Sequence, residues 1–327
     1  MSDANEPKID FSFTRTADKG HLTEPTFSGA LSFARRRYTK DVANADVAVV
    51  GIPFDLATTS RPGARLGPRG VREASTMIAW DRVHEWPYDP FDKIAVVDYG
   101  DVHIDAGVPQ DVPAAITDQF RVIHNAGVKT LMLGGDHFVT YPVLQSLAPR
   151  FDQPLSLIHF DAHSDTWAED KKTICHGTMF YHAAREGLVA PERSVQVGIR
   201  TFNKDDHGFN ILSAEAANDI GAQGVVARIR KIVGDAPVYI TFDIDCLDPS
   251  MAPGTGTPVV GGMTSMDAQR ILRGLQGLNV VGADVVEVAP AYDVSQITSL
   301  AAATLAMNMV GLFAACAVPS DRASDSL

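Results

Sequence analysis

Short apolar runs recur along this chain, and stretches with a helical period separate them. The runs are rich in Val, Ile and Leu and do not alternate with polar residues, which is typical of strands covered on both faces by helices. Because strand and helix alternate throughout, the sequence predicts an α/β fold: a single three-layer α/β/α domain with a mostly parallel central sheet. The predicted strands are residues 45–51, 94–98, 130–133, 155–160, 195–199, 238–242 and 280–288.

Two of the segments between these runs begin with recognisable helix signals. Thr264 stands three residues before Asp267, which is the spacing of a side chain that caps the amino end of a helix. Asp111 precedes a second helical stretch, which ends near Gly127. We therefore expect one helix to start just after Thr264 and another just after Asp111.

Size and composition are those of an ordinary globular enzyme. A length of 327 residues with 45% hydrophobic and 21% charged residues allows one large α/β domain and argues against a disordered or fibrous protein. No composition break, repeat or low-complexity linker divides the chain, so we expect a single domain over residues 1–327. Residues 1–25 or so are polar and irregular and are predicted to form an arm, and residues 320–327 a loose tail.

Charge, targeting signals and cysteines exclude several classes of protein. The formal net charge of −12 argues against a nucleic-acid partner and fits a site that attracts cations. The first 40 residues contain no apolar segment of signal-peptide length, and we expect no membrane span. The three cysteines are widely spaced and form no C-x-x-C pair, so no disulfide framework is expected. These features favour a cytoplasmic enzyme.

Potential metal ligands follow three of the predicted strands, at the end where open parallel sheets bind their ligands. Residues two apart on an extended chain point to the same side, so alternating Asp and His residues can converge on one point. Two sets alternate in this way, and a histidine follows a third strand. These residues are Asp161, His163 and Asp165; Asp243 and Asp245; and His137.

The chemistry of this set favours two divalent cations. Two imidazoles with four carboxylates suit a borderline-hard ion such as Mn²⁺ better than zinc or calcium. Four crowded carboxylates repel one another at low dielectric, whereas two divalent ions neutralise them. Such a pair, roughly 3.5–4 Å apart, can lower the pKa of a shared water and make hydroxide available near neutral pH. The pattern therefore predicts a two-metal hydrolytic centre.

Simpler roles are assigned to several polar residues near these motifs. Any single Asp at a strand end can cap a helix or a turn, although caps do not require interleaved histidines. Asp136 and Asp248 lack the alternating spacing and are interpreted as loop or supporting carboxylates, and His159, deeper in its strand, as a core or supporting histidine. Cys175 and His176 are neighbours, which rarely point the same way, so an inert thiol is expected.

Five longer motifs are highly specific in combination. They are Gly-Gly-Asp-His-Phe-Val-Thr at residues 134–140, and residues 160–166, 176–180, 241–264 and 284–293. Together they resemble the signatures of the ureohydrolase family, which contains the arginases and agmatinases, and most nearly those of its bacterial agmatinases. The resemblance begins near residues 51–55 and fails only at the two ends of the chain. It implies an arginase-like fold and hydrolysis of a guanidino compound.

The resemblance implies a role for each candidate residue. Two Mn²⁺ ions per subunit are expected, with Asp161 and Asp243 bridging them. His176 is expected to shuttle a proton, Glu287 to bind the guanidinium group of the substrate, and Thr257 to line the site. The implied ligand sets are His137, Asp161, Asp165 and Asp243 for one ion, and Asp161, His163, Asp243 and Asp245 for the other.

The motifs leave the tail of the guanidino substrate open. Arginases carry an Asn- and Ser-containing loop before the shuttle histidine, and residues 167–175 lack that pattern, which makes arginine a poor candidate. Agmatine, a small cation, is preferred on overall resemblance and gives putrescine and urea. A guanidino acid such as guanidinobutyrate is the alternative, because residues 169–172 combine two acidic side chains with two basic ones.

Two interpretations from other classes are weaker. A ureohydrolase-like binder without catalysis would be expected to have lost ligands, whereas all six are present together with His176 and Glu287. A two-metal phosphoesterase needs cationic side chains beside the metals, and the motifs supply few. The resemblance also implies a homo-oligomer, either a trimer or a hexamer.

Overall fold

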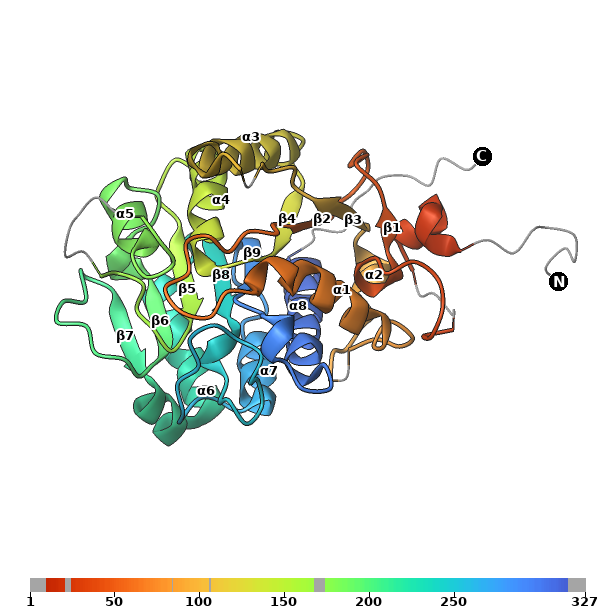
Figure 1. Ribbon diagram of the computed structural model, residues 1–327. Helices are drawn as coiled ribbons and strands as arrows, with labels where there is room; N and C mark the ends of the chain where they lie inside the picture. Colours follow the sequence, from red (N-terminus) through yellow and green to blue (C-terminus); the bar gives the residue numbers. More distant parts are fainter. Residues whose placement is uncertain (1–9, 21–24, 84, 106, 168–173, 317–327) are drawn as a thin grey trace, which may run out of the picture.

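In the part of the chain that the structure describes, nine strands form one sheet in which every neighbouring pair is parallel. The computed structural model describes residues 10–20, 25–83, 85–105, 107–167 and 174–316. The strand order is β1-β3-β2-β4-β9-β8-β5-β6-β7, which places the last strand in the middle of the sheet (Figure 1). The strands are β1 Arg37–Tyr38, β2 Val47–Gly51, β3 Val96–Asp101, β4 Lys129–Leu133, β5 Ser156–Phe160, β6 Val195–Ile199, β7 Asn210–Ser213, β8 Val238–Asp243 and β9 Val280–Val286.

The predicted strands agree with the sheet except at its edges. Each of the seven apolar runs overlaps one strand, from β2 to β6 and then β8 and β9, which confirms the parallel α/β fold. The two strands that were missed, β1 and β7, are the edge strands. An edge strand pairs on one side only and needs no continuous apolar run. In β7, for example, Leu212 is the one fully buried residue of four.

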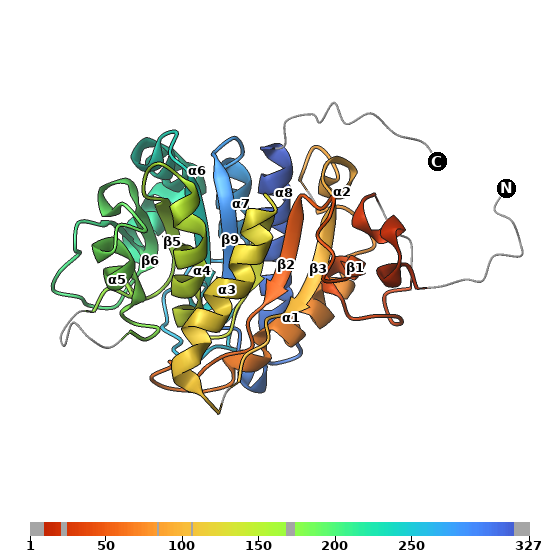
Figure 2. The same ribbon diagram turned by 90° about the horizontal axis from the view of Figure 1, so that it is seen from above.

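Helices cover both faces of the sheet (Figures 1 and 2). In Figure 1, α3, α4 and α5 lie above the sheet, and α1, α6, α7 and α8 lie below it. The two cores follow from the alternation of strand side chains: Val49 packs in the core on the side of α1 and α8, and Val50 in the core on the side of α3 and α4. The helices are α1 Gly67–Thr76, α2 Pro90–Lys93, α3 Val112–Asn125, α4 Thr140–Leu147, α5 Met179–Arg185, α6 Ala214–Val233, α7 Ser265–Gly274 and α8 Ile297–Ala315.

Both predicted helix starts are confirmed, with different local chemistry. Thr264 caps α7: its Oγ1 accepts the N–H of Asp267 at 3.1 Å and donates to the Asp267 carboxylate at 2.7 Å. α3 starts after Asp111, but the Asp111 side chain makes no cap, because this residue is the end of a preceding 3-10 turn. The 3-10 turns are Phe11–Phe13, Arg15–Asp18, Phe33–Arg35, Ala64–Leu66, Pro109–Asp111, His137–Val139, Ala148–Arg150, Pro191–Arg193, Ile244–Cys246 and Pro290–Tyr292.

The described part of the predicted N-terminal arm packs against the domain. Within residues 10–20, Ser12 and Ala17 are buried, and Gly20 donates its N–H to the Phe91 carbonyl at 2.8 Å. Most of the remaining arm, and the predicted tail, lie outside the described residues.

The helix α8 is apolar all round, because it packs against the sheet between α1 and α7. Among the described residues it is the one helix long and apolar enough to cross a membrane, although no span was expected from the sequence; 78% of its most apolar window is buried inside the domain. Its Asn308 side chain is also satisfied internally, since Oδ1 accepts the indole N–H of Trp86 at 2.9 Å. These contacts are those of a core helix.

Four adjacent strands in the middle of the sheet carry the candidate functional residues. β4, β9, β8 and β5 are neighbours and end at the same edge, so the loops that follow them open side by side. His137 follows β4, Glu287 follows β9, and the aspartate motifs follow β8 and β5. The topology therefore brings together residues as much as 150 positions apart, such as His137 and Glu287.

A buried ion pair fixes the outer half of the sheet. Arg72 of α1 donates two hydrogen bonds to Asp98 of β3, at 2.9 and 3.0 Å, and a third to Asp101. Asp98 also accepts the N–H of Phe33 at 2.6 Å, so the segment before β1 depends on the same carboxylate. The exposed fractions of Arg72 and Asp98 are 5% and 0%, which leaves almost no water to replace either partner.

We expect Asp98→Asn to lower the free energy of unfolding by about 3 kcal/mol, because the Arg72 guanidinium then loses its buried counter-charge and keeps only the partly exposed Asp101. The exposed pair of Arg121 and Asp118 on α3 supplies the control, and Asp118→Asn should change that free energy by less than about 1 kcal/mol. Urea denaturation followed by circular dichroism measures both. Equal effects of the two substitutions would contradict a stabilising role for the buried pair.

Candidate metal centre

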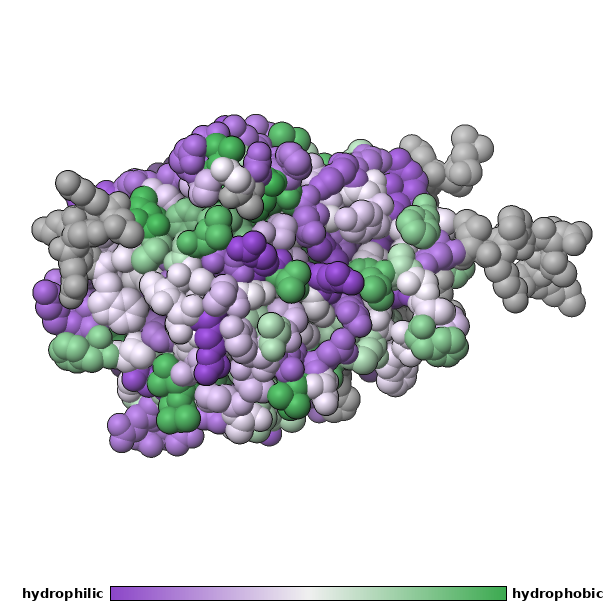
Figure 3. Space-filling view, in the orientation of Figure 1, coloured by the Kyte–Doolittle hydropathy of each residue, from purple (hydrophilic) through white to green (hydrophobic). Residues whose placement is uncertain are grey.

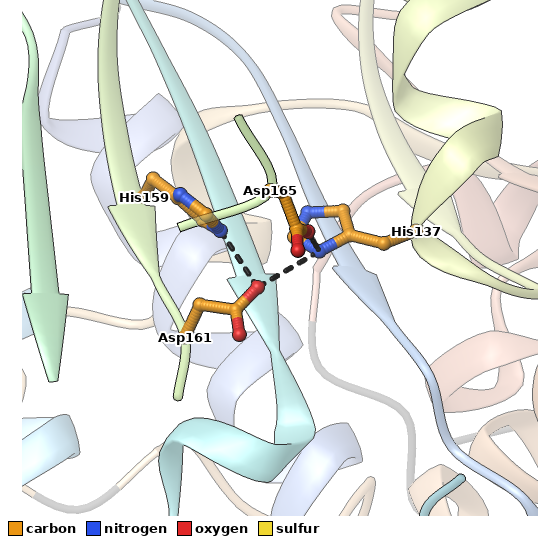
Figure 4. A group of neighbouring side chains, drawn as sticks. All are labelled: His137, His159, Asp161 and Asp165. Carbon is orange, nitrogen blue, oxygen red and sulfur yellow. Dashed lines mark hydrogen bonds and ion pairs between the residues drawn. The ribbon is translucent and has the colours of Figure 1, made fainter. Parts of the chain in front are cut away.

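Three carboxylates surround one nitrogen of His137, at the edge where the central strands end. From His137 Nδ1 the distances are 3.0 Å to Asp161 Oδ2, 3.0 Å to Asp165 Oδ2 and 3.3 Å to Asp243 Oδ2. Figure 4 shows Asp165 beside His137, with His137 and His159 approaching Asp161 from opposite sides. These residues come from the ends of three strands, β4, β5 and β8, which bring them to a common point.

A second cluster shares Asp161 with the first. His163 Nδ1 lies 3.2 Å from Asp161 Oδ1 and 3.1 Å from Asp245 Oδ2. Asp161 therefore offers one carboxylate oxygen to each cluster, which is what a bridging ligand requires. The ligand atoms of this cluster lie within 4.8 Å of one another, close enough to hold one cation. All six residues predicted as metal ligands thus lie in two adjoining clusters.

The hydrogen bonds of His137 direct a lone pair at the first cluster. Its Nε2 lies 2.8 Å from Thr241 Oγ1, and Thr241 donates its own proton to Asp284 Oδ1 at 2.6 Å. Thr241 therefore accepts from His137, which assigns the imidazole proton to Nε2. Nδ1 has no partner in hydrogen-bond geometry, although three carboxylate oxygens surround it. A lone pair facing three carboxylates is unfavourable unless a cation lies between them, so this arrangement fits a metal ion.

Asp284 lies behind His137, and no role was predicted for it. It is fully buried in β9 and accepts hydrogen bonds from the hydroxyls of Thr140, Tyr239 and Thr241 at 2.9, 2.9 and 2.6 Å. Burial raises the pKa of Asp284, while the nearby His137 and the three hydroxyls oppose that shift. Its only local signal was a carboxylate inside an otherwise apolar strand.

His159 supports Asp161 and is not placed to bind an ion itself. Gln196 donates one amide N–H to His159 Nδ1 at 3.1 Å and another to the Ser164 carbonyl at 2.6 Å, so Nδ1 is an acceptor. The ring proton then lies on Nε2, which donates to Asp161 Oδ2 at 2.7 Å. Burial lowers the pKa of His159 to about 4, so the ring is neutral at pH 7. His159 Nε2 lies close to the ligand atoms, but both of its nitrogens are already used.

The carboxylates of the two clusters cannot all stay ionised without a cation. Burial, followed by the charges of Asp245 and Asp161, raises the pKa of Asp243 well above its usual value. Burial and the charge of Asp161 likewise raise the pKa of Asp165, to about 7. A pair of divalent cations would remove this repulsion, and a set of imidazoles and carboxylates suits Mn²⁺ and similar ions. The residues present therefore fit the predicted pair of ions.

His176 and Glu287 form a hydrogen-bonded pair beside the clusters. His176 Nδ1 donates to Glu287 Oε1 at 2.9 Å. The backbone N–H of His137 donates to the same oxygen at 2.8 Å. Burial alone lowers the pKa of His176, but Glu287 raises it to about 9. The other carboxylate oxygen, Glu287 Oε2, is buried without a partner. A buried anionic oxygen without a donor is suited to receive a cationic N–H group.

Two residues of the site have a left-handed backbone. The φ angles of Asp165 and Glu287 are 52° and 63°, values that cost a residue with a side chain on the order of 1–3 kcal/mol. Hydrogen bonds hold both conformations: Glu287 donates its N–H to the Gly135 carbonyl at 2.9 Å, and the Asp165 carbonyl accepts the N–H of Phe180 at 3.1 Å. The strain is therefore located at the residues whose carboxylates the site uses.

The loop after β2, residues 52–63, is part of the site although no role was predicted for it. His176 Nε2 lies 2.9 Å from the Thr59 nitrogen and 2.7 Å from Thr59 Oγ1. The Ala57 N–H donates to Asp136 Oδ2 at 2.8 Å, and the Ala57 carbonyl accepts the N–H of His176 at 3.4 Å. The loop acts largely through backbone groups, which leave no pattern of side chains in the sequence.

The other polar residues have supporting positions. Thr257 donates to Asp245 Oδ2 at 3.2 Å, which places it at the second cluster. Asp248 accepts the N–H groups of Ser250, Gly261 and Gly262 at 2.8 to 3.1 Å and so organises a turn. The interpretation of Asp136 and Asp248 as loop carboxylates agrees with these contacts.

Comparison with known proteins identifies the family of this chain. Residues 45–311 match the family described as the Arginase family. The chain belongs to the arginase family. An agmatinase of Chromobacterium violaceum is 53% identical to it over 294 residues, which are 90% of this chain and 91% of that protein. The predicted resemblance to ureohydrolases, and to bacterial agmatinases in particular, is confirmed.

Two solved structures, among others, share this architecture. The crystal structure of a hypothetical agmatinase from Burkholderia thailandensis superposes with a TM-score of 0.91 at 52% identity, covering 93% of this chain and 97% of that chain. The proclavaminate amidino hydrolase of Streptomyces clavuligerus superposes with a TM-score of 0.83 at 34% identity, covering 90% and 100%. The predicted arginase-like fold is therefore confirmed.

We expect Thr241→Val to weaken the binding of Mn²⁺ by about 10- to 100-fold, because the hydroxyl that fixes the His137 proton on Nε2 is lost. Thr241→Ser keeps a hydroxyl and serves as the matched control. Isothermal titration calorimetry of the metal-free variants measures the affinities, and circular dichroism checks that each is folded. An unchanged affinity in folded Thr241→Val would rule out this role for the hydroxyl.

Proposed function

We propose that this member of the arginase family hydrolyses agmatine to putrescine and urea, with two Mn²⁺ ions bound in the adjoining clusters. The supporting observation is the convergence of six ligand-type side chains in a chain that is 53% identical to an agmatinase over 90% of its length. The proposed ligands are His137, Asp161, Asp165 and Asp243 for one ion, and Asp161, His163, Asp243 and Asp245 for the other.

Glu287 positions the guanidinium group in this proposal. Two divalent ions bound nearby would supply hydroxide near neutral pH, the nucleophile that attack on a guanidinium carbon needs. The N–H groups of His137 and His176 both donate to Glu287 Oε1, which fixes the carboxylate in one orientation. Glu287 Oε2 is thereby left to accept N–H groups of the substrate through charge-assisted hydrogen bonds.

His176 supplies a proton to the leaving amine in this proposal. Glu287 raises the pKa of His176 to about 9 despite burial, which favours the protonated ring that a general acid needs. Nδ1–H stays on Glu287, and the second nitrogen adjoins both the hydroxyl and the N–H of Thr59. A charged ring can donate to the Thr59 hydroxyl, and a neutral ring can accept from the Thr59 N–H. The site thus accommodates His176 before and after it has given up a proton.

A guanidino-acid hydrolase is the second candidate function. The observation that favours it is the shared fold of the proclavaminate amidino hydrolase, whose name gives another substrate. Residues 168–173, which contain the mixed acidic and basic side chains expected near the substrate tail, lie outside the described residues. Arginine is disfavoured by the sequence of that loop, and a binder without catalysis by the full set of ligand-type residues.

The proposal also includes the setting of the enzyme. We place it in the cytoplasm as a homo-oligomer, a trimer or a hexamer, built from one domain over residues 1–327 and without membrane or nucleic-acid partners. Cys175, Cys246 and Cys316 are all free, which suits a reducing compartment. On the face drawn in Figure 3, apolar residues lie in small groups among polar ones, so that view favours no particular subunit interface. Light scattering measures the number of subunits.

We expect the Mn²⁺-loaded protein to turn over agmatine with a kcat/KM about tenfold or more above the values for guanidinobutyrate, guanidinopropionate and arginine, a difference of about 1.4 kcal/mol in transition-state binding. The release of urea measures all four. A preference for a guanidino acid would replace agmatine by the second candidate. Hydrolysis of p-nitrophenyl phosphate at a comparable rate would contradict the whole assignment.

We expect Glu287→Gln to lower kcat/KM by about 100-fold or more while the bound metal stays near two ions per subunit, because the substrate loses a charged acceptor. Asp243→Ala should lose metal as well as activity, since a bridging ligand serves both ions. Metal analysis of the purified variants separates the two effects. Surviving turnover in Glu287→Gln, or retained two-metal stoichiometry in Asp243→Ala, would contradict the corresponding role.

A further inference from the structure

Two buried oxygens without a hydrogen-bond partner lie close to Gly256. One is Glu287 Oε2, and the other is Thr58 Oγ1 in the loop after β2. A Cβ atom built on Gly256 would lie 3.5 Å from Glu287 Oε2, 3.7 Å from Thr58 Oγ1 and 3.1 Å from the Arg61 carbonyl oxygen. Three oxygens from two different loops therefore converge where Gly256 has no side chain.

The Glu287 carboxylate and the Arg61 carbonyl can only accept hydrogen bonds, and the Thr58 hydroxyl, which can also donate, donates to neither. A buried polar atom left without a partner costs about 1–3 kcal/mol, and more when it carries a charge. Glu287 is 1% exposed, so water cannot satisfy its free carboxylate oxygen. The Thr58 hydroxyl is buried in the same region and makes no hydrogen bond to Glu287 or to any other described group. A cationic group with several N–H donors would satisfy both oxygens at once.

Gly256 is not required by the backbone conformation. It is not among the glycines with a positive φ, so an alanine could adopt the same conformation without strain. A Cβ would make ordinary contacts with the two side-chain oxygens, but at 3.1 Å the Arg61 carbonyl oxygen would have to move by a few tenths of an ångström. A side chain at this position would lie against Glu287 Oε2 and Thr58 Oγ1, so the glycine keeps a side chain away from both oxygens.

We propose that Thr58 is a substrate-binding residue, whose Oγ1 accepts one N–H of the substrate guanidinium while Glu287 Oε2 accepts another, and that Gly256 leaves the room for this group. The inference rests on the proposed function and deepens it, because it assigns the loop after β2 to guanidinium recognition. A planar guanidinium carries N–H groups on several nitrogens, so it can meet two oxygens in one plane. The contact involves the guanidinium and not the tail of the substrate.

Thr58→Val tests this contact, because valine has nearly the same shape and lacks the hydroxyl. We expect kcat/KM for agmatine to fall by about 10- to 100-fold, as for the loss of one hydrogen bond to a charged group. The inhibition constant of methylguanidinium, which has no tail, should rise by a similar factor. The Tm without substrate should stay the same or rise, since an unpaired buried hydroxyl is removed. Thr58→Ser should recover most of the lost kcat/KM.

A matched control comes from Ser156, whose Oγ is also buried without a partner but lies at the opposite end of β5 from the metal clusters. Ser156→Ala should leave kcat/KM and the inhibition constant unchanged. Gly256→Ala should raise KM for agmatine and leave Tm near that of the wild type, which keeps the proposal open to test if Thr58→Val does not fold.

The outcomes separate this inference from the proposed function. A wild-type protein that releases no urea from agmatine refutes the proposed function itself. If the wild type is active and folded Thr58→Val stays within about twofold of it, the role of Thr58 is refuted. An unchanged inhibition constant for methylguanidinium together with a raised KM for agmatine would place Thr58 at the substrate tail, which also overturns the proposal.

Discussion

All strands in the described part of the chain run in one direction, and this constraint decides where its chemistry can occur. Each connection returns across a face of the sheet, so every strand ends at the same edge and its loop opens there. The residues of the two clusters lie at the ends of β4, β8 and β5. Glu287 follows β9, and the loop after β2 contacts His176. An antiparallel arrangement of the same motifs would divide them between two opposite edges.

The groups behind two histidines decide what each can do. His137 and His159 both approach Asp161, at 3.0 and 2.7 Å, so distance alone does not distinguish them. The Thr241 hydroxyl donates its proton to Asp284 and accepts the Nε2–H of His137. The lone pair of His137 Nδ1 is therefore left for a cation. Behind His159 stands the amide of Gln196, which makes the other nitrogen a proton donor to Asp161. The supporting hydrogen bonds therefore separate a metal-binding imidazole from one that orients a carboxylate.

Sequence analysis predicted the features that depend on local periodicity and missed those that depend on contacts with residues far away in the chain. Continuous apolar runs predicted every strand covered on both faces, and alternating residues predicted the clusters, because both patterns repeat within a few positions. The edge strands β1 and β7 lack such a run. Sequence analysis missed Thr58 and Thr59 because the groups that they contact lie more than 100 positions away along the chain. It missed Asp284 for the same reason, since the hydroxyls that donate to it lie 43 to 144 positions away.

The position of β9 has a consequence for how the molecule is made. β9 is the last strand of the described residues, yet it pairs with both β4 and β8 and so links the half of the sheet built from β1 to β4 with the half built from β5 to β8. His137 belongs to the first half and its carboxylate neighbours to the second. During synthesis on the ribosome, the sheet cannot become continuous until β9, which ends at Val286, has emerged from the exit tunnel. A nascent chain cut short before that point has all six ligand-type side chains but lacks the strand that holds them together.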